Sequence, residues 1–522
     1  MSPSTPPPAF GNDASTSAQI EDVLRTHPGI RQVAVIVSKS SSLDQKVIAY
    51  LAPEDSYLGS ILVTQQIEDQ RIKEWRTVFD RLQRVPGSSA GFNIDGWHSS
   101  YTKQPIAEEE MHEWIDSTVE EILSLHPTEV LEIGCGTGLV LLRIASRTKR
   151  YVGVDFSPAS LKSLRDQLVT LEASSGSVTL LERQADNFNG LDNHSFDTVI
   201  LNSVVQYLPS LEQLRKVFEG ALKAANSPGA IFIGDVRSRT LLENFATSVE
   251  LFQAPPSLSV ADLRKRIRRR LDQERELVIA PEYFLALQRR YQQITRVEIR
   301  PKWGNSDNEM TRFRYNVTLF IDFQEQKSLD PRWLDWSVEG LTLVAIRDLL
   351  QSGREILAIK GVVNARIEKD VAALALLADS DDSVTACDLR EALSNKPTRG
   401  IYPDQLRALA REFDYDAEIS WSACCSDSSF DVLFRRLSAG KETTDASVAW
   451  PQPDSISGDL SLYIHDPSRI ARRRILIRQL RDFARATLPE SMVPSDFILV
   501  NALPLTSEGE IDRNALSSPD RT

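Results

Sequence analysis

Short apolar runs recur through the middle of the chain at the spacing of strands in an open parallel sheet. Helical segments are expected between the first four runs, and the amphipathic helix LEQLRKVFEGAL (211–222) precedes the last. This order predicts βαβ units in a doubly wound α/β sheet. Two later runs, VEIRP (297–301) and YNVTLFIDF (315–323), would close the sheet. The five runs that predict the parallel strands are EVLEI (129–133), YVGVD (151–155), VTLLE (178–182), DTVIL (197–201) and AIFIGD (230–235).

The two ends of the chain show other patterns. Residues 19–52 predict one amphipathic helix and two strands, VAVIV and KVIAYL, a piece too small to be stable alone. It therefore needs a partner elsewhere in the chain. Residues 331–436 are helix-rich with two strand-like runs, EILAIKGV and SFDVLFRR. A polar linker follows, and the chain closes with the amphipathic helix ILIRQLRDFARATL and a further short segment.

Composition narrows the class of protein. A chain of 522 residues is too long for one core, so two to four domains are expected. The net charge of −13 disfavours nucleic acid as a partner. Four cysteines and six scattered histidines show no disulfide framework or zinc spacing, so we expect no metal centre. With no bilayer-spanning run and no signal peptide, a soluble cytoplasmic protein is expected.

A glycine-rich turn follows the first strand of the predicted sheet. In EIGCGTG the glycines are Gly134, Gly136 and Gly138, and their missing Cβ atoms let backbone N–H groups approach a ligand. The dinucleotide fingerprint needs a further glycine where this chain has Leu139. Glu132 would repel a pyrophosphate but suits a ligand that carries an ammonium and a sulfonium. The spacing therefore favours a cationic nucleoside over a dinucleotide.

Polar residues at the ends of the next strands complete the predicted ligand site. Asp155 ends the second strand, where its carboxylate can accept both ribose hydroxyls. The third strand leads to Asp186 and Asn187, and Asp186 is placed to accept a hydrogen bond from the adenine amino group. The fourth strand ends at Asn202, beside the expected position of the sulfonium.

These motifs resemble those of class I (Rossmann-like) methyltransferases, which implies a seven-stranded, mostly parallel sheet and S-adenosylmethionine as cofactor. Longer segments are more specific: FNIDGWHSSYTKQPIAEEEMHEW, LNSVVQYLPSLEQL, GAIFIGDVRS and DNEMTRFRYNVTLF. They closely resemble methyltransferase domains embedded in nonribosomal peptide synthetase modules, as do WLDW, GVVNARIEKDV and ISWSACCSDSSFDVLFRR. The resemblance covers nearly the whole chain.

In that family the methyltransferase is inserted into the small C-terminal subdomain of an adenylation domain. QIEDVLRTHPGIRQVAVIV resembles the half before the insertion, and LPESMVPSDFILVNALPLTSEGEIDRNAL the half after it. The large adenylation core is absent, and Glu510 stands where the family has a lysine. Because that lysine stabilises developing negative charge, adenylation by this chain is not expected.

The resemblance also divides the chain. The expected parts are a disordered tail (1–18), the first half of the adenylation subdomain (19–60), the methyltransferase core (61–325), the helical and α+β C-terminal part of the insert (326–437), a linker (438–460) and the second half of the subdomain (461–522).

Candidate residues for catalysis follow from the same resemblance. Asn202, Gln206 and Tyr207 follow the fourth strand at the usual substrate edge, where Tyr207 could equally be a packing aromatic. Glu309 is the carboxylate expected to hold the substrate amine; the alternative is an ion pair with Arg312 or Arg314.

The segment before the sheet should supply a lid. Tyr101 is expected to close over the cofactor, by resemblance to a YT-containing motif of the family. His98 and Lys103 stand where the family usually has Asn and Gly, so the details of the lid stay open. A role for His98 as general base is possible, but a position facing solvent is favoured.

The sequence thus predicts an N-methyltransferase acting on an aminoacyl or peptidyl thioester tethered to a carrier protein. O- or C-methylation, epimerisation and a non-catalytic interaction module are the alternatives. The basic run LRKRIRRRL (263–271) predicts a solvated helix face or, alternatively, a docking surface for an acidic carrier protein. Other synthetase modules are possible further partners, whereas nucleic acid and membrane are not expected. The sequence does not identify the amino acid that is methylated.

Overall fold

The computed structural model describes residues 13–39, 45–60, 64–82, 92, 94, 96–170, 177–323, 329–424, 426–427, 429–437, 448–500, 502–506 and 508–516. They form two compact units. The small unit comprises the described residues up to Arg71 and from Pro467 onward, and the large unit is Ile72–Asp466. Among the described residues, no helix is long and apolar enough to cross a membrane.

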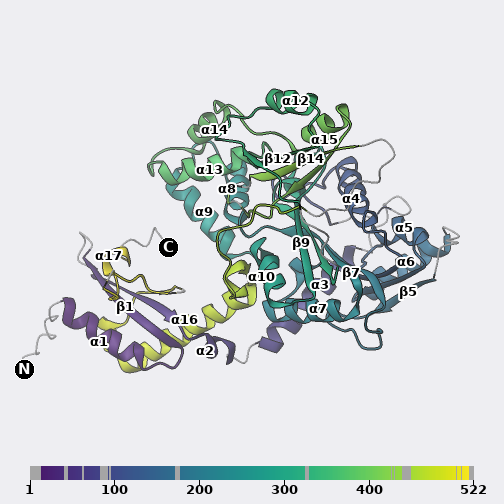
Figure 1. Cartoon of the computed structure of the whole chain (residues 1–522). Coiled ribbons are helices and arrows are strands. Elements are labelled where there is room, and N and C mark those ends of the chain that lie inside the picture. The colour runs from purple at the N-terminus through teal and green to yellow at the C-terminus, as the bar shows by residue number, and fades with distance from the viewer. Residues whose placement is uncertain are drawn as a thin grey trace, which may run out of the picture. The chain divides into compact units, whose positions relative to one another are not determined.

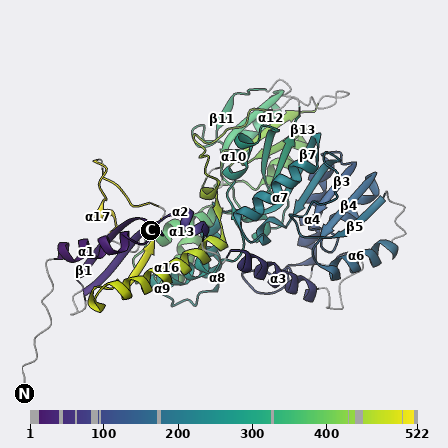
Figure 2. The same ribbon diagram turned by 90° about the horizontal axis from the view of Figure 1, so that it is seen from below.

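A seven-stranded sheet is the centre of the large unit (Figure 1). Its order is β5-β4-β3-β6-β7-β10-β9, with the first five strands parallel and β10 antiparallel to both of its neighbours. Figure 2 shows β3, β4 and β5 side by side. The predicted mostly parallel sheet and its two closing strands are confirmed. The strands are β3 (Glu129–Ile133), β4 (Arg150–Asp155), β5 (Ser177–Glu182), β6 (Phe196–Asn202), β7 (Ala225–Arg237), β9 (Ile294–Pro301) and β10 (Arg314–Ile321).

Both faces of this sheet are buried because successive side chains of a strand point to opposite faces. On β3, Leu131 belongs to a core cluster with helices α7 and α10, whereas Val130 belongs to a second cluster with α4, α5 and α6. The helices are α4 (Glu108–Leu123), α5 (Leu141–Ile144), α6 (Pro158–Thr170), α7 (Leu211–Ala224) and α10 (Glu282–Arg290).

The prediction of a helix between the third and fourth strands is wrong. Residues 183–195 connect β5 to β6 through turns, in which Gly190 and His194 have φ values of +73° and +51°. Asparagine, aspartate and glycine dominate this segment, and these residues favour turns over helices.

A second sheet, with the order β11-β12-β14-β13, forms the C-terminal part of the large unit. The two expected strands are β12 (Ile356–Val362) and β14 (Phe430–Arg436); β11 (Trp333–Asp335) and β13 (Tyr415–Ser420) were not predicted. Helices α12 (Leu343–Gln351) and α15 (Pro403–Glu412) pack on this sheet. A separate cluster joins α8 (Leu242–Gln253), α9 (Val260–Asp272), α13 (Glu368–Asp379) and α14 (Ala386–Ser394).

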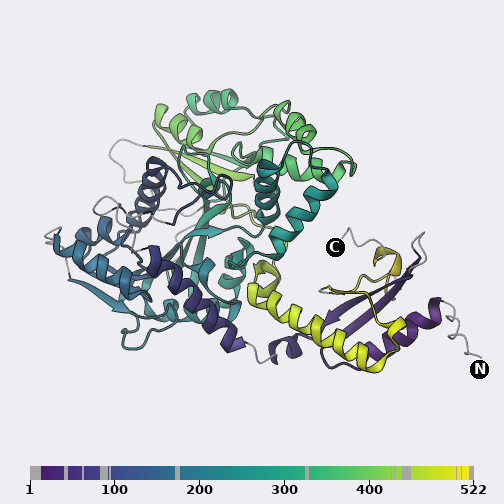
Figure 3. The same cartoon turned by 180° about the vertical axis from the view of Figure 1, so that it is seen from behind.

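The small unit joins the two ends of the chain in one sheet (Figure 3). Strands β1 (Ile30–Lys39) and β2 (Gln45–Pro53) are antiparallel, and β16 (Asp496–Leu499) adds to β2 in parallel. Leu24 of α1 (Asp13–Arg25) and Leu480 of α16 (Pro467–Thr487) are fully buried in its core. The N-terminal piece therefore finds its missing partner in the C-terminal segment. The remaining elements are α2 (Asp55–Ser60), a 3-10 turn (Glu490–Met492) and α17 (Arg513–Leu516).

Several domain boundaries differ from those expected from the sequence. The first helix begins at Asp13, inside the expected tail, while residues 1–12 lie outside the described residues, as do linker residues 438–447. The division between the units falls within α3 (Thr64–Leu82) and not at residue 60. Residues up to Asp466 stay with the large unit, because β15 (Ile464–His465) pairs with β8 (Val278–Ile279) and Leu460 and Ile464 are buried in its core.

Candidate functional site

The carboxyl ends of β3, β4, β6 and β7 open into a cavity of about 550 Å³ in the large unit. Ligands bind at this edge of an open α/β sheet, where loops following neighbouring strands diverge. Seven of the residues predicted for the site line the cavity: Glu132, Gly134, Gly136, Asp155, Asn202, Tyr207 and Glu309.

The three glycines of the loop all have positive φ, and at two of them a side chain would not fit. Gly134 has φ +77°, and a Cβ placed there would be 2.4 Å from Cγ2 of Val204. Gly136 has φ +51° with open space around its Cβ position. Gly138 is a structural residue, since it does not line the cavity and its Cβ position is 2.4 Å from Cδ1 of Leu164 on α6. The first two glycines therefore form the cradle, and the third lets α6 pack closely.

Asp155 connects this loop to the second strand. One carboxylate oxygen accepts a hydrogen bond from the Gly136 N–H (2.9 Å), and the other accepts one from the Ser157 N–H (2.8 Å). Burial raises the pKa of Asp155, and these backbone hydrogen bonds oppose the rise. The aspartate thus fixes the glycine loop and also faces the cavity, as a ribose-binding carboxylate would.

Glu132 lies in the cavity wall beneath the loop. Its Oε2 accepts a hydrogen bond from the Tyr151 hydroxyl at 2.8 Å. Burial raises the pKa of Glu132 to about 7; the Tyr151 hydrogen bond lowers it and the charge of Asp155 raises it. A buried carboxylate with so high a pKa gains most from a cationic ligand, because the positive charge favours its ionised form.

The end of β6 presents an unsatisfied polar atom. Asn202 Oδ1 is buried with no hydrogen-bond partner in the described part of the chain. It lies 2.2 Å from the position that a Cβ on Gly234 would occupy, so that glycine leaves room for the amide. An orphan acceptor at the cavity wall is suited to a bound ligand. Gln206 is buried outside the cavity, and both of its amide atoms lack partners among the described residues.

Three further predicted residues do not line the cavity. At the end of β5 the wall is made by Arg183, Gln184 and Ala185, and neither Asp186 nor Asn187 reaches it. The Tyr101 hydroxyl is 3.1 Å from Ser248 Oγ, and its ring packs edge-on against Phe252. Their roles in cofactor binding stay predictions.

Helix α3 adds a wall that the sequence did not indicate. Ile72, Trp75 and Val78 line the cavity, and the Trp75 ring contacts that of Tyr207 with centroids 4.6 Å apart. The Ser157 hydroxyl donates to Asp80 Oδ1 at 2.6 Å, which ties the helix to the end of β4. Spacings of three along a helix put these apolar residues on one face, but periodicity does not reveal what that face covers.

Asp235, near the end of β7, is a further residue of importance that was not predicted from the sequence. It is fully buried with φ +61° and accepts hydrogen bonds from Trp114 Nε1 (3.1 Å), Arg314 (2.5 Å) and the Ser203 hydroxyl. Lys302 Nζ lies 3.5 Å away. Burial alone would raise the pKa of Asp235, but the two cations lower it. The ionised aspartate therefore fixes the loops that follow β6 and β9.

Glu309 does not form the ion pair considered as an alternative. Its two oxygens accept from the Ser100 N–H (2.7 Å) and hydroxyl (2.8 Å). Arg312 instead bonds Asp307 at 2.6 Å, and Arg314 bonds Asp235. Glu309 thus holds the 97–105 segment at the cavity, and His98 of that segment also lines it. His98 is itself exposed, in keeping with the favoured solvent-facing position.

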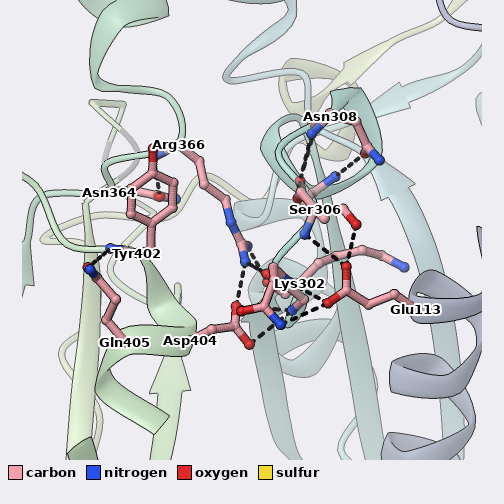
Figure 4. A network of polar contacts seen from close by, with 12 residues as sticks. Glu113, Lys302, Ser306, Asn308, Asn364, Arg366, Tyr402, Asp404 and Gln405 are labelled. Carbon is pink, nitrogen blue, oxygen red and sulfur yellow. Dashed lines mark hydrogen bonds and ion pairs between the residues drawn. The ribbon is translucent and has the colours of Figure 1, made fainter. Parts of the chain in front are cut away.

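A polar network fixes the loop that carries Glu309 (Figure 4). The buried guanidinium of Arg366 donates to the carbonyls of Lys302 (2.6 Å) and Gly304 and to Asp404 (2.6 Å). Glu113 of α4 accepts from the Ser306 N–H at 2.8 Å. The C-terminal part of the insert thereby positions residues 302–308, which lead directly into Glu309.

We expect Arg366→Lys to destabilise the large unit by about 2 kcal/mol, because one ammonium cannot reach all three acceptors that the planar guanidinium satisfies. Urea unfolding measures the change, and Arg411→Lys, at an exposed position of α15, is the matched control. Equal stability of the two variants would show that the network does not hold the loop.

The basic run 263–271 forms mostly intramolecular ion pairs. Arg266 and Arg270 both bond Glu250 of α8, at 2.8 and 2.7 Å. Arg264 bonds Asp382 at 2.5 Å and also the carbonyls of Leu377 and Ser380. These three arginines pair within the helical cluster but stay partly exposed, and the run also contains the exposed residues Lys265, Arg268 and Arg269, so the helix face is solvated as expected.

Comparison with known proteins agrees with this geometry. Residues 131–232 match a family model described as a methyltransferase domain. The chain is 37% identical over 518 residues to chondramide synthase of Chondromyces crocatus, covering 96% of this chain and 13% of that protein. It is 26% identical to cyclosporin synthetase of Tolypocladium inflatum, covering 96% of this chain and 3% of that protein. The chain therefore spans a small fraction of the relatives that it matches.

Among solved structures, the N-methyltransferase NodS of Bradyrhizobium japonicum in complex with S-adenosyl-L-homocysteine matches with 16% identity and a TM-score of 0.31, over 47% of this chain and 97% of that one. The family match covers the strands and the glycine loop that form the cavity. The chain is therefore an S-adenosylmethionine-dependent methyltransferase, and over 96% of its length it is similar to nonribosomal peptide synthetases.

Proposed function

We propose that this methyltransferase N-methylates an aminoacyl or peptidyl thioester, tethered to a carrier protein, during nonribosomal peptide synthesis in the cytoplasm. The observation that carries the proposal is the similarity to peptide synthetases over 96% of the chain, which includes the small unit as well as the methyltransferase. We do not expect the chain to activate acyl groups itself, because the exposed Glu510 replaces the lysine of the family pattern. A substrate delivered by another protein is consistent with both observations.

The residues of the cavity fit this role. Bound S-adenosylmethionine supplies an activated methyl group on a sulfonium. Gly134 and Gly136 admit the ligand, Asp155 and Glu132 provide acceptors, and Asn202 offers an unpaired amide oxygen. Helix α3 and the 97–105 segment contribute to the wall of the cavity. Aligning nucleophile and methyl carbon in this way can contribute roughly 7–11 kcal/mol to the lowering of the barrier.

The decisive test uses a carrier protein loaded with a set of amino acids. After incubation with S-adenosylmethionine, fragmentation mass spectrometry should place one added methyl on the α-amine. A methyl on a hydroxyl or on the α-carbon would overturn the N-methyl assignment in favour of O- or C-methylation, and inversion at the α-carbon without methylation would indicate an epimerase. Absence of S-adenosylmethionine binding in calorimetry would leave only a non-catalytic module.

The affinity for S-adenosylmethionine should depend on pH through Glu132. Burial raises the pKa of this carboxyl to about 7, so below that pH the cationic ligand must displace a proton. Affinity should therefore rise with pH up to about 7, by roughly tenfold per unit at most, and level off above it. Calorimetric titrations between about pH 6 and 8 measure the slope.

Glu132→Gln is the control for this pH dependence. The variant should bind more weakly above pH 7 and lose the slope, because glutamine does not titrate. A wild-type affinity that is flat across this range would contradict the assignment of a cation-facing role to Glu132. The same titrations with S-adenosylhomocysteine, which lacks the sulfonium charge, separate the contribution of the sulfonium to the affinity from that of the ammonium.

A further inference from the structure

A second group of charged side chains lines the cavity beside the cofactor cradle. Arg237, at the end of β7, forms ion pairs with Glu274 at 2.8 Å and with Glu276 at 2.7 Å. All three residues line the cavity. The two carboxylates follow α9 in a short connection to β8, a segment in which sequence periodicity gives no signal.

The two carboxylates differ in how many of their oxygens already accept a hydrogen bond. Glu274 Oε2 accepts from Arg237, while its Oε1 accepts from the N–H groups of Arg275 and Glu276, each at 2.9 Å. Glu276 Oε2 accepts from Arg237, but its Oε1 has no hydrogen bond within the described part of the chain. With 23% of its side chain exposed and the residue in the cavity wall, Glu276 presents that oxygen to a ligand.

Glu276 lies near the predicted substrate edge. The N–H of Leu277, the residue after Glu276, donates to the carbonyl of Gln206, the residue before Tyr207, at 2.9 Å. Tyr207 follows Asn202 by one 3-10 turn, and both residues line the same cavity. The free oxygen of Glu276 is therefore on the side of the cavity where the fourth strand ends.

We infer that Glu276 binds the amine of the aminoacyl substrate through Oε1 and receives the proton released on methylation. This inference rests on the proposed function. The nitrogen lone pair forms the new N–C bond as the C–S bond of the sulfonium breaks, and that electron pair stays on sulfur. The positive charge moves to nitrogen, and one N–H proton passes to Glu276 and then to solvent. A carboxylate beside the nitrogen stabilises the charge that develops there.

The other cavity carboxylates are less suited to this task. Both oxygens of Glu309 accept hydrogen bonds from Ser100, which is the contact that holds the 97–105 segment. Asp155 accepts from the glycine loop and Glu132 from Tyr151, on the cofactor side. Arg237 keeps Glu276 oriented by occupying its second oxygen. Glu276 combines a fixed orientation with an open acceptor.

Binding of two stable substrate analogues tests the inference without turnover. Aminoacyl-pantetheine with an amide in place of the thioester, and the same compound without its amino group, are titrated into the full chain saturated with S-adenosylhomocysteine. Glu276→Gln should weaken binding of the amine analogue roughly 10- to 100-fold and leave the desamino analogue unchanged. Glu243→Gln, at an exposed position of α8, should match wild type for both.

The methylation rate provides the second measurement. Glu276→Gln should lower kcat on an aminoacyl carrier protein and change its pH profile, while S-adenosylmethionine affinity stays at the wild-type value. The wild type should bind the amine analogue more tightly than the desamino analogue. If Glu276→Gln keeps this preference and Glu309→Gln loses it, the amine is bound by Glu309 and the inference is overturned. Failure of the wild type to methylate any amine would instead reject the proposed function, so the two failures are distinguishable.

Discussion

Gly134→Ala is expected to abolish measurable binding of S-adenosylmethionine and, with it, methyl transfer. The residue has φ +77°, a conformation that costs an L-amino acid about 1–2 kcal/mol. The added Cβ would also lie 2.4 Å from Cγ2 of Val204, so the loop must move. Because the Gly134 N–H donates to the Val154 carbonyl at 2.7 Å, a shift would also disturb the end of β4. We expect affinity to fall at least about 100-fold, which corresponds to about 2.7 kcal/mol.

Two matched variants separate the clash from backbone strain. Gly190 has a similar φ of +73°, open space around its Cβ position and no place in the cavity wall. The Gly190→Ala variant should therefore bind the cofactor normally. Val204→Ala in the Gly134→Ala background removes the clashing methyl and should restore part of the affinity. Calorimetric titration measures all four proteins, and near-wild-type binding by Gly134→Ala would refute the cradle described here.

The strands and the glycine loop could be predicted from the sequence because each depends on local signals. Apolar runs of five or six residues mark strands buried on both faces, and Gly134 and Gly136 are needed where the backbone has positive φ. The parallel addition of β16 to β2 joins segments more than 400 residues apart. The small size of the N-terminal piece predicted only that it needs a partner, and the resemblance of both ends to one split subdomain identified that partner.

The rest of the site depends on long-range packing that no local pattern records. Asp235 ends an apolar strand, which could have drawn attention to it, but its partners Trp114 and Lys302 come from α4 and from the loop after β9. The lining by α3 depends on where that helix packs. Glu309 lines the cavity, and its predicted role in holding the substrate amine stays a prediction. Its bond to Ser100 spans 209 residues and has no signature in sequence spacing.

Asp235→Asn is expected to lower the free energy of unfolding by about 3–5 kcal/mol, the cost of breaking a buried ion pair by removing one partner. Asparagine tolerates the positive φ of this position and keeps the size of the side chain, so the change removes mainly charge. Lys302, with 1% of its side chain exposed, and Arg314, with 14%, would then lack their shared counter-ion. Loss of the Ser203 hydrogen bond to a carboxylate would also loosen the segment beside Asn202.

The pH dependence of this variant distinguishes lost charge from lost packing. Burial lowers the pKa of Lys302, and removing Asp235 takes away a charge that raises it. The unfolded chain then binds more protons than the folded one between the lowered pKa and the ordinary value near 10.5, so stability of Asp235→Asn should rise with pH across that window. Adding Lys302→Met should restore stability near neutral pH and remove this slope.

Asp431→Asn is the matched control for this prediction. Asp431 is also buried, but burial raises its pKa to about 6, which makes the neutral asparagine a close substitute. Its Oδ1 accepts from the Gly361 N–H at 2.9 Å, a bond that an amide oxygen can also make. Urea unfolding at several pH values should therefore show a small effect for Asp431→Asn and a large, pH-dependent one for Asp235→Asn. Equal losses in the two variants would mean that Asp235 acts through packing alone and not as the counter-ion that fixes the loops following β6 and β9.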